Sequence, residues 1–220
     1  ERRHVLHGIN WSIEPGQSWA LLGANGAGKT TLLMLLSGDL LPALGGKVEW
    51  FGQIQRPSLY ELRERIGLVS GDLQARHQRP SQTGLETVIS GFQGSIDLCA
   101  PPRPAQIKAA QHWMDFLGVA HLARRNIVRL SYGELRRLLI TRAMVTGPEL
   151  LLLDEPLAGL DAQAKSGVLE LIERLIQRGV GVVLVTHHAG DLPPSLTHVA
   201  ELEGGRLVFK GARQDYSKSF

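Results

Sequence analysis

The sequence predicts an α/β fold, in which helices cover a parallel sheet and a helical segment interrupts it. Two continuous apolar runs, at 150–153 and 180–185, are typical of parallel strands that are buried on both faces. Between these runs, apolar residues recur at helical spacing and Gly179 suits a helix C-cap, which gives a strand–helix–strand unit. The residues at that spacing are Val168, Leu171, Ile172, Leu175 and Ile176.

The other elements follow in chain order. A turn at Pro15-Gly16 precedes a strand-like run at 19–22, and an apolar helix-like run covers 31–36. Gly45-Gly46 precedes a short β-rich run at 47–51. After a proline-rich break at 101–104, helical spacing covers 107–117 and 135–145. We therefore expect the segment from about Thr83 to Thr146 to be helical and without a strong strand.

Composition excludes several classes of protein. The 220 residues are 43% apolar, which excludes wholesale disorder, and this length fits one large domain with an inserted subdomain. The single cysteine, Cys99, excludes a disulfide scaffold and suits a reducing compartment. No apolar stretch reaches the roughly 18–20 residues that span a bilayer. A net charge of only +3, with no long basic block, gives no reason to expect nucleic acid as a partner. We expect a cytoplasmic protein.

Residues 23–30 read Gly-Ala-Asn-Gly-Ala-Gly-Lys-Thr, which matches the phosphate-loop pattern between a strand and a helix. Glycines let successive backbone N–H groups converge on an anion, and the following helix adds its positive end. Lys29 can reach the β- and γ-phosphates, and the Thr30 hydroxyl can ligate Mg²⁺. The predicted nucleotide-binding residues of this segment are Gly23, Asn25, Gly26, Gly28, Lys29, Thr30 and Thr31.

Two carboxylates end the apolar run at 150–153. Asp154 would hold Mg²⁺, and Glu155 would polarise the attacking water as a general base. Alone, such a pair could equally be a solvated turn; the phosphate loop makes the catalytic interpretation the stronger one. The predicted metal ligands are therefore Thr30 and Asp154.

A histidine pair follows the run at 180–185. Ligands of a parallel sheet gather at the carboxyl ends of its strands, which would place His187 near the γ-phosphate as a second catalytic candidate. A two-histidine zinc site is the competing interpretation, but adjacent side chains of an extended segment point apart. By default, His188 is a surface or packing residue.

Residues 130–134 read Leu-Ser-Tyr-Gly-Glu, and Ser131 lies 23 residues before Asp154. This segment resembles the signature of ATP-binding-cassette (ABC) ATPases, usually written LSGGQ. The phosphate loop, this signature, the acidic strand end, a D-loop-like 158–161 and His187 occur in the family's order. Several motifs in one order, over nearly the whole chain, make the resemblance specific.

The resemblance implies an ABC-type P-loop NTPase, with a RecA-like core at about 1–82 and 147–220 and a helical subdomain at about 83–146. It also implies that two cassettes pair head to tail around two Mg·ATP molecules, as a homodimer or as tandem cassettes of one polypeptide. Ser131 and Gly133 would contact the ATP bound by the partner's phosphate loop, and Asp161 would link the two sites. Hydrolysis through Glu155 would release the pair.

Three departures from the family pattern have consequences. A glutamine is expected after 66–69, where Gly71 cannot supply a ligand; Gln74 could substitute, and coupling to a membrane permease is an open question. Tyr132 and Glu134 replace a glycine and a glutamine of the signature. The adenine-stacking aromatic of the family would precede Val5, outside the sequence given, so we expect a fragment of a longer polypeptide.

The departures resemble one subgroup, the molybdate-linked, photorepair-type proteins with two cassettes in one chain, and especially their second cassette. We therefore expect a transport-type ATPase, at the inner face of a membrane if a permease is present. A non-transport ABC protein and a regulatory cassette that barely hydrolyses ATP are the alternatives. The segments that carry this resemblance are Val69-Ser70-x-Asp72-Leu73, Ile89-Ser90-Gly91-Phe92, the signature and His187-His188-Ala189-x-Asp191.

Overall fold

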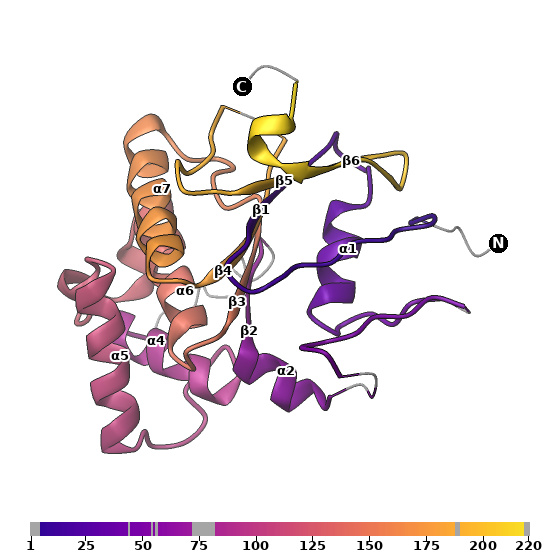
Figure 1. Ribbon diagram of the computed structural model, residues 1–220. Coiled ribbons are helices and arrows are strands. Elements are labelled where there is room, and N and C mark those ends of the chain that lie inside the picture. Colours follow the sequence, from indigo (N-terminus) through magenta and orange to yellow (C-terminus); the bar gives the residue numbers. More distant parts are fainter. Residues whose placement is uncertain are drawn as a thin grey trace.

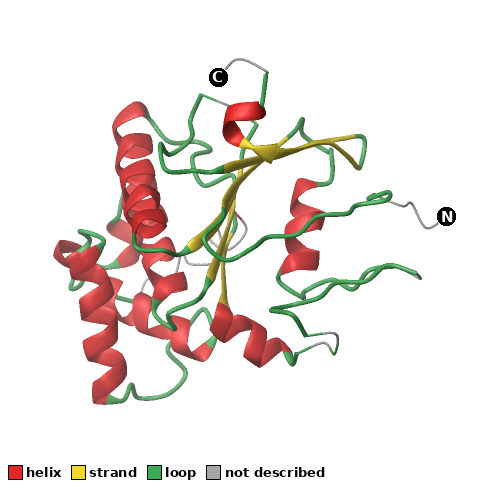
Figure 2. Cartoon of the chain, viewed as in Figure 1, coloured by secondary structure: helices red, strands yellow, loops and turns green. Residues whose placement is uncertain are grey.

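A six-stranded sheet runs through the centre of the molecule (Figures 1 and 2). The structure is a computed structural model that describes residues 5–43, 45–53, 55, 57–71, 82–187 and 190–217. The strand order is β2-β3-β4-β1-β5-β6, and neighbouring strands are parallel except for the antiparallel pair of β5 and β6. The strands are β1 (Ser18–Leu22), β2 (Ile66–Val69), β3 (Leu150–Asp154), β4 (Gly181–Val185), β5 (His198–Glu203) and β6 (Arg206–Ala212).

Helices cover both faces of this sheet. In Figure 1, α1 lies on one side of the sheet, while α4, α5, α6 and α7 lie on the other. The α-helices are α1 (Lys29–Leu36), α2 (Leu59–Arg65), α4 (Gly84–Ser90), α5 (Pro104–Phe116), α6 (Tyr132–Met144) and α7 (Ala162–Gln177). The short 3-10 helices are η1 (Gly91–Gln93), η2 (Ala120–Leu122), η3 (Ile127–Arg129) and η4 (Arg213–Asp215).

The strands alternate between two apolar clusters, which explains their uninterrupted apolar sequence. Leu151 and Leu153 belong to the cluster shared with α4 to α7. Leu152 belongs to the cluster on the opposite face, with Leu32 and Leu33 of α1. The central residues of such a strand are buried on both faces of the sheet, so they are apolar. The prediction of two parallel strands around α7 is confirmed by β3 and β4.

The helix ends also agree with the sequence pattern. The backbone turns left-handed at Gly118 after α5 and at Gly179 after α7, where φ is +71° and +90°. Glycine adopts such angles without steric cost, so it ends helices well. The described residues between 83 and 146 contain helices and one isolated bridge, from Thr83 to Asn126, but no strand.

One expected element is wrong. The β-rich run at 47–51 forms no strand, and its only ladder contact is an isolated bridge between Trp50 and Gln53. Phe51 and Gly52 both have positive φ, which turns the chain back on itself before it can pair with a neighbour. Trp50 is nevertheless buried, and its Nε1 donates to the backbone oxygen of Leu36 at 2.7 Å. The apolar residues of the run at 47–51 therefore pack against the core and do not form a strand.

Three elements at the edges of the predicted core have signals of their own. The Gly204-Gly205 pair between β5 and β6 is a typical two-residue hairpin turn. A capping box begins α2 at Ser58 and Glu61, and a second one begins α4 at Thr83, with Glu86 as its partner.

No helix of the described residues is both long and apolar enough to cross a membrane.

Candidate nucleotide-binding site

The predicted site residues follow the carboxyl ends of three strands that are neighbours in the sheet. The phosphate loop follows β1, Asp154 ends β3, and His187 comes two residues after β4. Because β4 pairs in parallel with both β1 and β3, the three segments leave the sheet at the same edge. The topology therefore concentrates the phosphate loop, the acidic pair and the histidine at one place.

Two glycines of the loop have no room for a side chain. At Gly23, where φ is +149°, a Cβ atom would lie 2.3 Å from the backbone oxygen of Leu202. At Gly28, the N-cap of α1, a Cβ atom would lie 2.8 Å from Leu6 Cδ2, and φ is +104°. Gly23 is required both for its conformation and for the close approach of backbone, whereas Gly28 is required for its positive φ, since the Leu6 side chain can move. By contrast, Asn25 and Gly26 lie on the exposed rim of the loop.

Lys29 lies folded over the loop. Its side chain is only 6% exposed, and Nζ donates to the backbone oxygens of Gly23 at 2.7 Å and Ala24 at 3.1 Å. The same Nζ lies 3.6 Å from Oε1 of Glu155. The cation is therefore placed at the concave side of the loop, next to the carboxylate that follows β3. Thr31 is half-buried in the first turn of α1.

Thr30 and Asp154 form the candidate Mg²⁺ site. Thr30 Oγ1 donates to Oδ2 of Asp154 at 2.8 Å, while Oδ1 of Asp154 is buried and has no hydrogen-bond partner among the described residues. Burial raises the pKa of Asp154, and the hydrogen bond from Thr30 opposes that rise only in part. An orphaned carboxylate oxygen beside a hydroxyl fits Mg²⁺, which takes oxygen ligands and usually keeps waters and phosphate oxygens as the rest.

The described residues contain no group of three or more histidine, cysteine or acidic side chains that could hold a metal ion. A site with one hydroxyl and one carboxylate suits a cation shared with a bound phosphate rather than one caged by protein. The residues present therefore fit Mg²⁺ that arrives with a nucleotide.

Glu155 is held in an unusual conformation. Its φ of +50° is in the left-handed region, which residues with a Cβ atom rarely adopt. Its N–H donates to the backbone oxygen of Val185, at the end of β4, at 3.1 Å. Its Oε2 lies 2.8 Å from Nδ1 of His187. The carboxylate thus lies between Lys29 and His187. This arrangement can orient a base toward a group bound at the loop.

The signature segment begins α6. Ser131 is the N-cap, and its hydroxyl accepts from the N–H of Glu134 while Glu134 accepts from the N–H of Ser131. Burial opposes ionisation of Glu134, but hydrogen bonds from Ser131 and Arg125 lower its pKa overall. A Cβ atom at Gly133 would lie 2.6 Å from Cβ of Ala164, so α6 and α7 touch here. Ser131 is exposed and Gly133 is buried.

The predicted residues divide into two groups. Contacts bring together Lys29, Thr30, Asp154, Glu155 and His187. Within the described part of the chain, no hydrogen bond or ion pair joins Ser131, Gly133 or Asp161 to that group. Asp161 instead caps α7, where it accepts from the N–H of Ala164 at 2.8 Å. Gln74 and His188 lie outside the described residues.

Sequence reasoning missed Arg136. This residue is 1% exposed, and its Nη1 donates to the backbone oxygen of Glu155 at 3.3 Å. Burial lowers the pKa of the guanidinium, while Tyr132 and Asp154 act to raise it. The sequence does carry a signal for this residue, namely a charged residue within the apolar stripe of a helix. An arginine at such a position is almost never buried without partners, so it indicates a specific contact.

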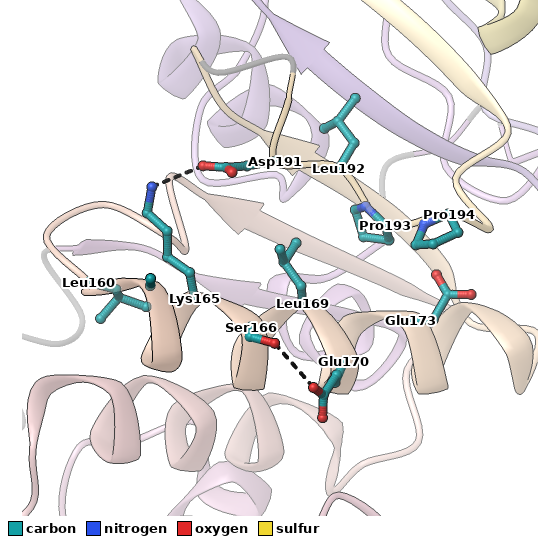
Figure 3. Close-up of a pocket in the computed structure, with 11 residues that line it drawn as sticks. Leu160, Lys165, Ser166, Leu169, Glu170, Glu173, Asp191, Leu192, Pro193 and Pro194 are labelled. Carbon is teal, nitrogen blue, oxygen red and sulfur yellow. Dashed lines mark hydrogen bonds and ion pairs between the residues drawn. The ribbon is translucent and has the colours of Figure 1, made fainter. Parts of the chain in front are cut away.

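A surface cavity of about 610 Å³ lies elsewhere, between α7 and the segment at 191–194 (Figure 3). Figure 3 shows Lys165 reaching across to Asp191, and the two form an ion pair of 3.0 Å. The lining of the cavity includes none of the predicted nucleotide-binding residues. The candidate phosphate site and this cavity are separate features.

Comparisons with known proteins give one consistent result. Residues 6–158 match the family model described as "ABC transporter". The chain is 35% identical over 209 residues to "ABC transporter ATP-binding protein ModF" of Escherichia coli (strain K12), covering 92% of this chain and 42% of ModF. It is 34% identical over 217 residues to "Hemin import ATP-binding protein HmuV" of Hahella chejuensis, covering 96% of this chain and 82% of HmuV.

Solved structures share the fold. The structure of cbiO1 from Clostridium perfringens, described as part of the ABC transporter complex cbiONQ, matches with a TM-score of 0.79 and 29% identity. That match covers 94% of this chain and 82% of cbiO1. The chain spans less than half of ModF but most of HmuV and cbiO1.

Proposed function

The chain belongs to the ABC transporter family and is an ATPase of the ATP-binding-cassette type; from this premise we propose how its residues act. Mg·ATP binds at the phosphate loop, with Lys29 contacting the β- and γ-phosphates. Thr30 and Asp154 hold Mg²⁺, which neutralises charge on the phosphates. The observation that carries the proposal is the convergence of Lys29, Asp154, Glu155 and His187 at one edge of the sheet.

Glu155 is the candidate general base. Its carboxylate orients a water molecule and accepts its proton as the water attacks the γ-phosphate. His187 is hydrogen-bonded to this carboxylate, so it fixes the direction in which the carboxylate points. In the proposed complex its imidazole also contacts the γ-phosphate. Lys29 stabilises the charge that develops on the phosphate oxygens. A positioned base typically contributes about 10²–10⁴-fold to the rate.

The cassette acts in a head-to-tail pair, in which Ser131 and Gly133 contact the ATP of the partner. Two features support this proposal. Ser131 is exposed at the N-terminal end of a 13-residue helix, an end that favours an anion. No hydrogen bond or ion pair that the described chain contains ties it to its own phosphate loop. Asp161, exposed at the start of α7, links the two sites.

The chain is divided into a core at about 1–82 and 147–220 and a helical subdomain at about 83–146. The described residues from 83 to 146 form helices and no strand, which supports this division. Buried residues of α4 to α6 nevertheless share one apolar cluster with the sheet, so the two parts are packed together.

Within the family, the cassette belongs to the molybdate-linked, photorepair-type subgroup. The similarity to ModF and the aromatic Tyr132 in the signature support this assignment. Its partner is a second cassette, in a homodimer or in the same polypeptide, and a membrane permease is a further candidate because cbiO1 belongs to a transporter complex. The protein then works at the cytoplasmic face of a membrane.

Phosphate release from ATP by the purified chain tests the proposed activity. We expect release in Mg²⁺ and none in EDTA, with Thr30→Val strongly reduced because one Mg²⁺ ligand is lost. Equal rates in Mg²⁺ and in EDTA would overturn the assignment of Thr30 and Asp154. A chain that releases no phosphate under any of these conditions would overturn the proposal as a whole.

A further inference from the structure

Arg136 joins the signature helix to the backbone of Glu155 within one chain. It is the largest fully buried side chain among the residues that the structure describes, and its Nη1 donates to the backbone oxygen of Glu155 at 3.3 Å. Its guanidinium also lies over the ring of Tyr132, whose centre is 5.6 Å from Arg136 Cζ, which is a cation–π contact. A buried cation is costly unless acceptors surround its N–H groups. Its position therefore depends on both partners.

Tyr132 is the outer end of this connection. It directly follows Ser131, and its ring is 48% exposed. A Cβ atom at Gly159 would lie 3.7 Å from Cε1 of Tyr132, so the ring also lies against the loop that precedes α7. A shift at the start of α6 therefore moves the ring that lies against the guanidinium of Arg136.

Glu155 is the inner end. Its backbone oxygen accepts from Arg136 and from the N–H of Ala158, and its own N–H donates to Val185. The left-handed conformation of Glu155 is unfavourable for a residue with a Cβ atom, so it persists only where surrounding contacts impose it. Arg136 supplies one of these contacts, and it is the one that comes from the signature helix.

We propose that Arg136 is a positioning residue that couples the two nucleotide sites of a cassette pair. The signature at Tyr132 faces the partner's ATP, whereas Glu155 acts on the ATP of its own chain. Engagement of the signature thus stabilises the backbone conformation that aims Glu155, through Arg136. This inference rests on the proposed head-to-tail pairing and adds a route between its sites. Coupling of this kind is reciprocal in binding free energy.

The test is the ATP dependence of the rate for the whole chain and for Arg136→Met, Arg136→Lys and Tyr132→Leu, which removes the ring that lies against Arg136. For Arg136→Met we expect kcat to fall by about tenfold to a hundredfold, because misplacing a catalytic group has effects of this size. KM should stay within about twofold, since the phosphate loop is untouched. The Hill coefficient should fall from above one to one in Arg136→Met and Tyr132→Leu. Arg136→Lys, which keeps a donor, should recover part of kcat.

Arg142→Met is the matched control. Arg142 is the other buried arginine of α6, and it donates to Oγ of Ser90 and to the backbone oxygen of Ser95, away from Glu155. Its loss should lower the melting temperature and leave the Hill coefficient unchanged. If Arg136→Met does not fold, Tyr132→Leu decides, because it removes the ring from a half-exposed position and leaves the buried arginine in place.

Three results would overturn the inference: a wild-type Hill coefficient of one, a Hill coefficient retained in Arg136→Met or Tyr132→Leu, or equal changes in Arg136→Met and Arg142→Met. Lys29→Ala separates this failure from that of the proposed function. If wild type hydrolyses ATP and Lys29→Ala does not, the proposed function stands and only the coupling role fails. If wild type is inactive, both fail.

Discussion

Nδ1 of His187 lies 2.8 Å from Oε2 of Glu155, although the two residues follow different strands. The other carboxylate oxygen of Glu155 lies 3.6 Å from Nζ of Lys29. One carboxylate therefore connects the end of β4 with the phosphate loop that follows β1. A change at any of these three residues alters the surroundings of the other two, so their effects on rate will not add.

Replacing Lys29 with alanine should abolish tight ATP binding, because the loop loses its cation. Equilibrium titration with a fluorescent ATP analogue measures the affinity. Lys165→Ala is the matched control, since Lys165 pairs with Asp191 beside the surface cavity and does not contact the loop. Unchanged affinity in Lys29→Ala would refute the assignment of the phosphate loop.

Glu155→Gln should keep ATP binding but slow turnover by about 10²–10⁴-fold, because glutamine retains the shape of the side chain without the base. An ATP-bound pair should then accumulate, and light scattering after size exclusion detects it. Turnover at the wild-type rate would remove Glu155 from the role of base.

Ser131→Arg should block ATP-driven pairing, because a bulky cation replaces the small exposed residue that we propose to face the partner's phosphate. Ser131 also caps α6, and losing a cap costs about 1 kcal/mol. Ser58→Arg controls for this cost, since Ser58 caps α2 with the same capping box. A pair that still forms with ATP in Ser131→Arg would count against the composite site.

Asp154→Asn should raise the melting temperature of the Mg²⁺-free protein at neutral pH. Burial raises the pKa of Asp154 in the folded state, so between its ordinary and its raised pKa the folded chain binds more protons than the unfolded one. Stability attributable to this group therefore falls as pH rises through that window, and asparagine removes the loss.

Thermal denaturation in EDTA from about pH 4 to pH 8 measures this effect. Thr30→Val gives a check of direction, because it removes the hydrogen bond that opposes the rise in the pKa of Asp154 and should move the window upward. A pH profile identical in wild type and Asp154→Asn would contradict the burial of the charged carboxylate.

Gly133→Ala should destabilise the protein, because its Cβ would lie 2.6 Å from that of Ala164. Overpacking of this kind costs about 1–3 kcal/mol. Gly167→Ala is the matched control on α7, where the nearest atom would be 3.7 Å away, so alanine should stabilise the helix by about 0.5–1 kcal/mol. Opposite shifts in the urea midpoint are expected, and equal shifts would show that α6 and α7 can separate at Gly133.

The central strands could be predicted from sequence because complete burial requires every residue to be apolar. The hairpin of β5 and β6 lacks that signal, since β6 has no fully buried residue and its exposure alternates. The strand expected at 47–51 does not form, because Trp50 and Val48 pack into an apolar cluster and the run does not join the sheet. Apolar character alone does not distinguish these two outcomes.

The candidate site shows a similar division. The residues that we propose to bind phosphate and metal occur in short motifs, so their spacing predicts them. The contact from Arg136 to Glu155 joins residues 19 positions apart on different elements, and helical periodicity places Arg136 among apolar neighbours. Its partner is set by the packing of α6 against the sheet, which local sequence does not encode.

The bonds from Lys29 to the backbone oxygens of Gly23 and Ala24 have a thermodynamic consequence. They fix the curvature of the loop in the protein by itself, so the loss of backbone freedom is incurred during folding and not when the ligand arrives. When a nucleotide binds, Lys29 exchanges these backbone acceptors for phosphate oxygens, and its ammonium group is already ordered. A preorganised receptor of this kind loses little conformational entropy on binding and need not wait for a loop to order.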